Sequence, residues 1–318
     1  MPGPVTLSLR HRLPWVRRNM PGYDPPRHAG CIQTMKLAAV TMVYNEAHLL
    51  PIWARHYTRH VGARHCYVID HGSEDGSTAD LGAMNVVPVV RWPTDEERRA
   101  AFISRVCAEL LGRYDGVLHT DVDELLVPDP GLFADLPAWA AATPHDVVTA
   151  VGLNVIAVAE EAPIDPLRPI SRQRRYVAFS SALCKPVYAR RAVRWAPGLH
   201  SADAPVVFDS LFLFHLRYCD RAQALARLAR TRAMSWASEQ AGAHARVSDA
   251  EFISLLDNFA AMPRREHVAF DASLPPMADW LRKVQASQQG REFETYRIDL
   301  QINAYELWPL PPRFDGTF

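Results

Sequence analysis

The chain has few lysines and no excess of charge of either sign. Its 318 residues include 35 Lys or Arg and 35 Asp or Glu, which gives a formal net charge of +0. Only Lys36, Lys185 and Lys283 are lysines, and all the other basic residues are arginine. A chain without net charge is not drawn as a whole to nucleic acid or to an anionic membrane. We therefore predict that nucleic acid is not a partner.

Cysteine and long apolar runs are also scarce. The 5 cysteines are odd in number and include no Cys-x-x-Cys pair, so neither a disulfide framework nor a zinc site is indicated. No apolar run approaches the roughly 18 residues that a membrane span needs. Prolines and a histidine (Pro2, Pro4, His11 and Pro14) interrupt any secretory leader. These features predict a cytoplasmic protein with reduced thiols.

Residues 1–34 are rich in proline, arginine and glycine, and they predict a flexible N-terminal extension. Within residues 1–20, arginines such as Arg17 and Arg18 alternate with apolar residues such as Trp15. The alternative is therefore a peripheral contact of this segment with the inner face of a membrane.

Short apolar runs alternate with helical patterns in the next part of the chain. Leu37–Val43 and Cys66–Asp70 suit buried strands, as do residues 85–90 and 117–120, and helices are predicted after the first and third. This alternation predicts an α/β fold with a mostly parallel, doubly wound sheet flanked by helices. Ligands bind such sheets at the carboxyl ends of the strands. From Asp220 onward, stretches rich in Ala, Arg and Leu predict a helical C-terminal region.

Two carboxylates follow the fourth predicted strand. Residues 119–124 are His-Thr-Asp-Val-Asp-Glu, so Asp121 and Asp123 leave an extended chain on the same face. Such a pair can hold a hard divalent cation through oxygen, with water or phosphates completing the shell. Acidic pairs are also common in solvated turns, so the motif alone leaves both interpretations open.

Two further motifs precede this one. Residues 42–46 are Met-Val-Tyr-Asn-Glu, and residues 67–78 include Asp-His-Gly-Ser-Glu-Asp-Gly-Ser. With the Asp-Val-Asp-Glu core, their order resembles the nucleotide-sugar-binding half of family 2 glycosyltransferases, which have the GT-A fold. Within them it looks closest to the subgroup related to family 92. The resemblance covers residues 36–130, and more loosely 180–220.

The resemblance implies a GT-A-type, Rossmann-like sheet and a domain division. We expect a glycosyltransferase domain at residues 35–218, with a nucleotide-sugar half at 35–130 and an acceptor half at 131–218. The helical region at 219–318 would pack on it.

The resemblance also implies donor contacts in the first half. Tyr44 would pack on the nucleotide base, or only on the sheet edge. Asp70 would contact the base, or it would accept hydrogen bonds from the glycine-rich turn that follows. Asn45 and Glu46 are expected near the donor, although a helix cap and a favourable helix dipole also account for them. His71 stands where many relatives have Asp or Asn, which leaves the preferred base open.

Asp121, Asp123 and a late histidine are expected to surround Mn²⁺ or Mg²⁺, with Asp121 on the metal or the ribose. In GT-A enzymes a histidine often completes the metal shell, and His200 is the candidate; the alternative is a backbone hydrogen bond at its Pro-Gly turn. His215 is expected to be structural. Lys185 is expected on a phosphate, because this chain otherwise almost always uses arginine.

Several other basic residues are weaker candidates for binding a diphosphate or a metal. Arg98, Arg99 and Arg105 lie on the helix before the Asp-x-Asp motif, where guanidinium groups suit a diphosphate but are usually solvated. His56 and His60 are four apart on a helix face that also includes Trp53, so a packed pair is favoured over a metal site.

Together these features predict a glycosyltransferase that moves a sugar from a nucleoside-diphosphate sugar to a hydroxyl of a glycan or lipid-linked acceptor, with inversion. Inversion requires a general base, and Glu161, in an acidic loop, is the candidate. One alternative is a nucleotidyltransferase acting on sugar phosphates, although no Gly-x-Gly-x-(Arg/Lys) motif opens the first strand-to-helix turn. The other is a non-catalytic glycan- or nucleotide-binding module.

Overall fold

The described residues of the computed structural model are 35–288, 292–293 and 302–318. The predicted extension over residues 1–34, with its membrane contact, lies outside them. None of the described helices combines the length and the apolar character needed to cross a bilayer.

The first sheet has the strand order β3-β2-β1-β4-β9-β6. Its strands are β1 (Leu37–Val43), β2 (Cys66–Asp70), β3 (Asn85–Pro88), β4 (Gly116–His119), β6 (Val147–Thr149) and β9 (Pro186–Ala189). β1 pairs in parallel with β2 and β4, and β2 with β3. β9 runs antiparallel to both β4 and β6, so β9 alone opposes the direction shared by the other strands of this sheet. The prediction of a mostly parallel sheet is confirmed in part, for this sheet and with β9 as its exception.

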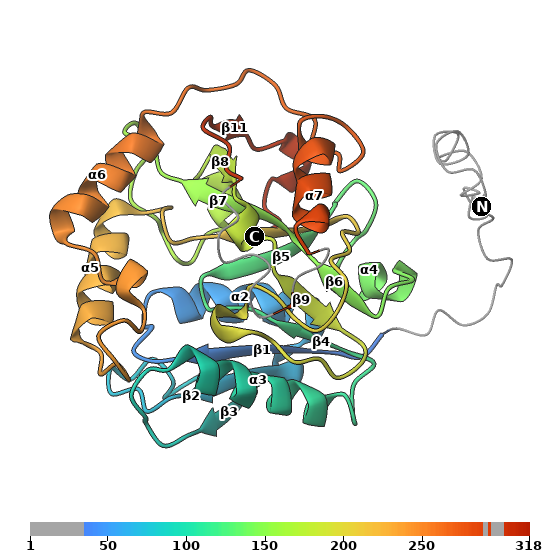
Figure 1. Cartoon of the computed structure of the whole chain (residues 1–318), viewed down its shortest axis with the longest axis vertical. Coiled ribbons are helices and arrows are strands. Elements are labelled where there is room, and N and C mark those ends of the chain that lie inside the picture. Colours follow the sequence, from blue (N-terminus) through green and yellow to red (C-terminus); the bar gives the residue numbers. More distant parts are fainter. Residues whose placement is uncertain (1–34, 289–291, 294–301) are drawn as a thin grey trace, which may run out of the picture. The chain divides into compact units, whose positions relative to one another are not determined.

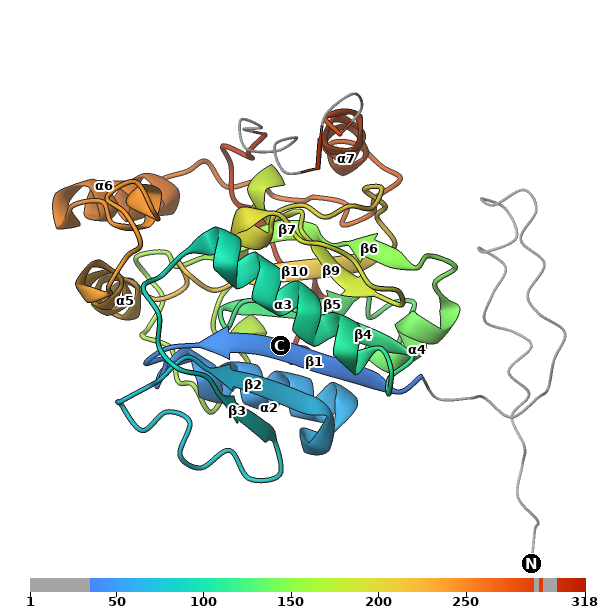
Figure 2. The same ribbon diagram turned by 60° about the horizontal axis from the view of Figure 1, so that its bottom comes forward.

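Helices cover both faces of the first sheet, as predicted for a doubly wound fold (Figure 2). The described helices are α2 (Leu49–Val61), α3 (Glu96–Leu110), α4 (Leu136–Ala142), α5 (Arg221–Ala233), α6 (Asp249–Ala260) and α7 (Met277–Ala286). Alternate residues of β1 belong to different apolar clusters because they point to opposite faces. Ala39 shares a cluster with Trp53 of α2, and Val40 shares one with Ile103 of α3.

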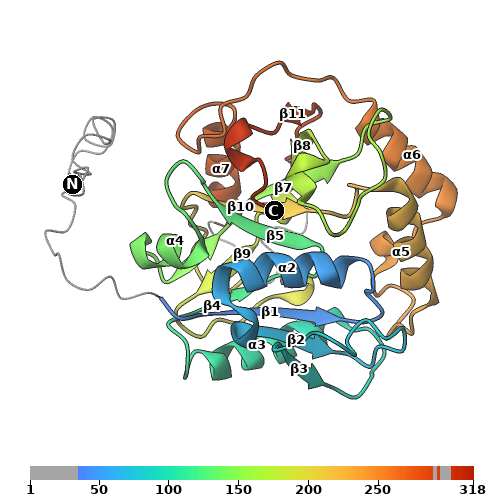
Figure 3. The same cartoon turned by 180° about the vertical axis from the view of Figure 1, so that it is seen from behind.

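A second sheet, which was not predicted, has the order β11-β8-β7-β10-β5. It contains β5 (Glu124–Pro128), β7 (Val151–Ile156), β8 (Tyr176–Phe179), β10 (Leu211–His215) and β11 (Trp308–Pro309). β10 is parallel to β7 but antiparallel to β5, so this sheet is mixed. Helix α2 lies between β1 and β5 (Figure 3), where the Tyr57 hydroxyl donates to the Glu124 carbonyl at 3.1 Å. The two sheets therefore share one core.

The strand order places three motifs at one edge. Tyr44 follows β1, Asp70 ends β2 and Asp121 follows β4, and these strands are parallel, so their carboxyl ends meet. The acidic motif also has a topological role. β4 ends at His119 and β5 begins at Glu124, so the Asp-Val-Asp-Glu motif lies at the turn between the two sheets, which we call the acidic turn (residues 120–124).

The C-terminal part of the chain is helical but also completes the core. α5 and α6 lie side by side (Figure 1) and form a small apolar cluster with Leu228 and Phe252 among its members. β11, by contrast, pairs with β8, and Phe314 is fully buried in the main cluster. All described residues fall in one compact unit.

Candidate functional site

Asp121 lies between two cations. Its Oδ1 accepts from Arg99 of α3, and its Oδ2 accepts from Lys185 Nζ at 2.9 Å. The same ammonium group lies 2.6 Å from Glu124 Oε1. Burial raises the pKa of the Asp121 carboxyl, but Arg99 and Lys185 outweigh it and hold that pKa well below the usual range. Lys185, with a side chain only 7% exposed, is thus a buried counter-ion of two carboxylates.

Asp123 contacts one residue of the second sheet and one residue of the C-terminal helices. Its Oδ2 accepts from Arg227 of α5 and lies 3.1 Å from His215 Nε2. Burial raises the pKa of Asp123, but Arg227 and His215 lower it more strongly, so the carboxylate is ionised. Arg227 Nε also donates to Glu46 Oε1 at 2.8 Å, and Arg230 Nη2 lies 3.5 Å from Glu46 Oε2. One guanidinium group therefore connects the Tyr-Asn-Glu motif to the Asp-x-Asp motif.

Asp70 and Asn45 hold the glycine-rich turn. Asp70 Oδ1 accepts from the Ser73 backbone N–H at 2.7 Å, and its Oδ2 accepts from Thr78 Oγ1 at 2.8 Å. Asn45 Oδ1 accepts from the Glu74 backbone N–H at 2.8 Å. The structure shows the turn-forming alternative for Asp70. The alternatives given for Asn45 and Glu46 were wrong: α2 begins at Leu49 with His48 at its N-cap position, no side chain caps it, and its first turn contains no acidic residue. A contact of Asp70 or Asn45 with a nucleotide stays a prediction.

The ring of Tyr44 faces a guanidinium group that the sequence analysis did not single out. The Arg91 Cζ lies 3.5 Å from the Tyr44 ring centroid, and Arg91 Nη1 lies 2.8 Å from His71 Nδ1. The ring of Trp92 is 4.0 Å from that of His71. Burial first, and then Arg91, lower the pKa of His71 to about 4. Arg91 and Trp92 directly follow the strand predicted at residues 85–90. Their position at the carboxyl end of a predicted strand could have indicated that they belong to the site.

His200 and Glu161 are held by other groups. His200 Nδ1 lies 2.6 Å from the Ala182 carbonyl oxygen, the backbone contact of the alternative prediction. Glu161 accepts from the backbone N–H groups of Val158 and Arg175 and lies 3.6 Å from Arg174 Nε. Over the described ranges, no three His, Cys, Asp or Glu side chains gather as metal ligands would. The structure therefore does not bring His200 together with Asp121 and Asp123.

The donor set of this turn does not fit the predicted Mn²⁺ or Mg²⁺. Glu46, Asp121, Asp123 and Glu124 present eight carboxylate oxygens, and six of them accept a hydrogen bond or lie within 3.0 Å of a cationic nitrogen of the chain. A seventh, Glu46 Oε2, has no hydrogen bond from the described residues but lies 3.5 Å from Arg230 Nη2. A dication held by two of these residues would have to replace protein cations that already neutralise them. The predicted ligand set Asp121, Asp123 and His200 thus has no support in this geometry.

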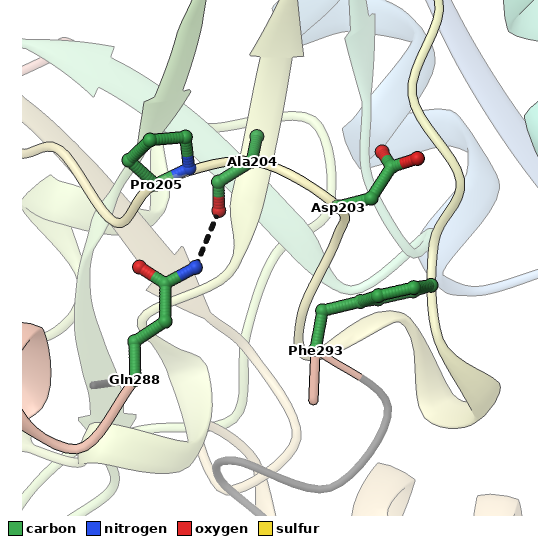
Figure 4. A pocket seen from close by; sticks show the side chains of 5 residues that line it. All are labelled: Asp203, Ala204, Pro205, Gln288 and Phe293. Carbon is green, nitrogen blue, oxygen red and sulfur yellow. Dashed lines mark hydrogen bonds between the residues drawn. The ribbon is translucent and has the colours of Figure 1, made fainter. Parts of the chain in front are cut away.

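A cavity of about 430 Å³ lies elsewhere, lined by Asp203, Ala204, Pro205, Gln288 and Phe293 (Figure 4). Gln288 Nε2 donates to the Ala204 carbonyl at 2.7 Å across it. None of the residues paired around the acidic turn lines this cavity, so it does not mark the candidate site.

No protein-family model and no curated protein matches the chain. Among solved structures, similarity is found to the mannosyltransferase PcManGT from Pyrobaculum calidifontis in complex with GDP-Man and Mn²⁺. Identity is 19% and the TM-score 0.25, over 39% of this chain and 36% of that one. The chain therefore spans little more than a third of that protein's length.

A second similar structure is the mannose-1-phosphate geranyltransferase from Thermus thermophilus. Identity is 10% and the TM-score 0.28, over 84% of this chain and 68% of that one. TM-scores this low do not establish a shared fold, so the α/β architecture described above depends on the chain's own strand order.

Proposed function

We propose that this chain transfers a sugar from a nucleoside-diphosphate sugar to a hydroxyl of a glycan or lipid-linked acceptor. The observation that supports the proposal is the concentration of buried and half-buried, paired charges at the turn between β4 and β5, at the carboxyl edge of the parallel strands. The resemblance of the three ordered motifs to family 2 glycosyltransferases supports the same function.

The leaving group of such a reaction is a nucleoside diphosphate, which acquires negative charge as the bond to the sugar breaks. Fixed positive charges near that position stabilise the transition state. Arg99, Lys185 and Arg227 supply such charges around the turn. In this proposal Tyr44 and Asp70 contact the base, Asn45 and Glu46 shape that side of the donor site, and Asp121 contacts the ribose.

In the transfer step, the acceptor oxygen attacks the anomeric carbon and the bond from that carbon to the diphosphate oxygen breaks. The hydroxyl proton passes to a carboxylate, for which Glu161 remains the proposed residue, and inversion is the proposed outcome. The predicted Mn²⁺ or Mg²⁺ takes no part in this scheme, because the carboxylates that would bind it are already paired.

The test is product analysis with a panel of nucleoside-diphosphate sugars, preceded by thermal unfolding with the matching nucleoside diphosphates. A ligand at 100 times its Kd stabilises the folded form by about 2.7 kcal/mol. Stabilisation followed by slow release of nucleoside diphosphate is the expected result. Pyrophosphate release from a nucleoside triphosphate and a sugar phosphate would instead indicate a nucleotidyltransferase. Binding without turnover would indicate a binding module, and no stabilisation by any nucleotide contradicts all three.

A further inference from the structure

Arg227 reaches the acidic turn from outside the two sheets. It lies on α5, whose Ala224 and Leu228 pack with Phe252 and Leu256 of α6 in a cluster separate from the main core. Its guanidinium group donates to Glu46 and Asp123 at once. These two residues are 8% and 4% exposed, so both carboxylates would be costly to bury without a counter-ion.

The carboxylates of the turn are already paired with cations of the chain. Glu46, Asp121, Asp123 and Glu124 form direct ion pairs with Arg99, Lys185, Arg227 and Arg230, and Arg99 also pairs with Glu96 at 3.3 Å. A dication added here would leave an excess of positive charge in a region of low dielectric, unless one of the protein cations withdrew.

Arg227 cannot withdraw by losing its proton. A guanidinium group stays charged in proteins. Removal of its charge from Asp123 would require movement of the side chain or of α5.

We propose that Arg227 takes the position of a divalent cation at Asp123, so that the chain binds its nucleoside diphosphate without metal. The inference rests on the proposed function and deepens it, because it assigns the positive charge at the diphosphate to Arg227 together with Lys185. Asp123 then acts as a positioning residue for Arg227 and not as a metal ligand.

The first test uses Mn²⁺ alone, with free Mn²⁺ measured by electron paramagnetic resonance. The variants are Arg227→Met, Arg227→Lys, Asp123→Asn and the double variant Arg227→Met with Asp123→Asn. Arg221→Met is the matched control, because Arg221 lies on the same helix in an exposed ion pair with Asp257. Circular dichroism first establishes which variants are folded. Arg227→Lys retains a positive charge at this position and can be measured even if Arg227→Met does not fold.

The native chain, Arg221→Met and Arg227→Lys should bind no Mn²⁺ at this turn. Arg227→Met should gain one Mn²⁺ site, which the double variant loses. Mn²⁺ binding by the native chain that disappears in Asp123→Asn would overturn the proposal. So would an Arg227→Met variant that is folded and still binds no Mn²⁺.

The second test measures nucleoside diphosphate affinity by calorimetry, in EDTA and in Mn²⁺. The native chain should bind equally in both, within about twofold, and Arg227→Met should lose on the order of tenfold or more in EDTA and recover in Mn²⁺. A native chain that binds only with Mn²⁺ overturns the inference. A native chain that binds no nucleotide in either condition refutes the proposed function, and the Mn²⁺ titration still decides the role of Arg227.

Discussion

Lys185 separates the half-buried carboxylate of Asp121 from the buried carboxylate of Glu124 with one ammonium group. Replacement by methionine keeps much of the side-chain volume but leaves Asp121 and Glu124 facing each other without that charge. Loss of one partner from a buried ion pair typically costs about 3–5 kcal/mol. We therefore expect Lys185→Met to lower the free energy of unfolding by that amount, as measured by urea denaturation at pH 7.

Lys283→Met is the control for this prediction, because Lys283 is exposed on α7 and its loss should change stability by less than about 0.5 kcal/mol. A loss below about 1 kcal/mol in Lys185→Met would show that the two carboxylates do not depend on Lys185.

The sequence predicted those site residues that belong to a recognisable local motif. The Asp-Val-Asp-Glu sequence identified Asp121 and Asp123, and the rarity of lysine drew attention to Lys185, although its observed partners are carboxylates. Arg227 was not predictable, because it lies 104 residues from Asp123 on a helix with several other arginines. His215 was interpreted as structural. The apolar sequence of its strand does not indicate that Asp123 contacts the histidine at the end of that strand.

Two histidines of helix α2 allow us to predict how the stability of the folded chain depends on pH. His56 Nε2 lies 2.9 Å from the Leu126 carbonyl oxygen, and His60 Nδ1 accepts from the Leu136 backbone N–H, so the pair is packed as predicted. Burial first, and then Arg59, lower the pKa of His60 to about 4; burial also lowers that of His56. Both rings are thus neutral in the folded chain at pH 5, where the unfolded chain would bind the protons.

A lowered histidine pKa contributes stability that is present above the unfolded value of about 6.5 and is lost as the pH falls toward the folded value. Each such ring reduces stability by about 1.4 kcal/mol per pH unit in that window. We expect the native chain to lose stability steeply between pH 6.5 and 5, and His60→Gln to show a shallower slope. Urea denaturation at several pH values measures both. Parallel slopes in the two chains would mean that His60 does not titrate on unfolding.

The sequence predicted local elements better than their pairing. Strands β1 and β2 begin and end where the apolar runs do, at Leu37–Val43 and Cys66–Asp70, because those runs are buried on both faces. The reversed direction of β9 and the second sheet were not predictable. The paired strands are far apart in the sequence, as in the pairing of Leu211 with Pro128. The apolar periodicity of a segment also does not indicate in which direction its strand runs in the sheet.

For the whole molecule, the open question is whether the region predicted as 219–318 folds as a part of its own. Phe314 is fully buried, and its ring lies 5.4 Å from that of Phe212 and 5.5 Å from that of Phe214 on β10. The C-terminal end of the chain thus contributes to the same core as the second sheet. Because these rings share one apolar cluster, we expect the described unit to unfold as one cooperative system.

Phe314→Ala tests this directly, because removal of a fully buried phenylalanine ring costs about 3–5 kcal/mol. If the core is shared, the variant should lower the unfolding midpoint of the entire unit in a single transition. Circular dichroism and tryptophan fluorescence should then coincide, since Trp308 lies in this core and Trp53 lies beneath the first sheet. Tyr305→Ala, at a ring that is 74% exposed, is the control and should change stability by less than about 0.5 kcal/mol. Two separate transitions in Phe314→Ala, with the acidic turn still intact after the first, would show instead that residues 219–318 form an independent folding unit.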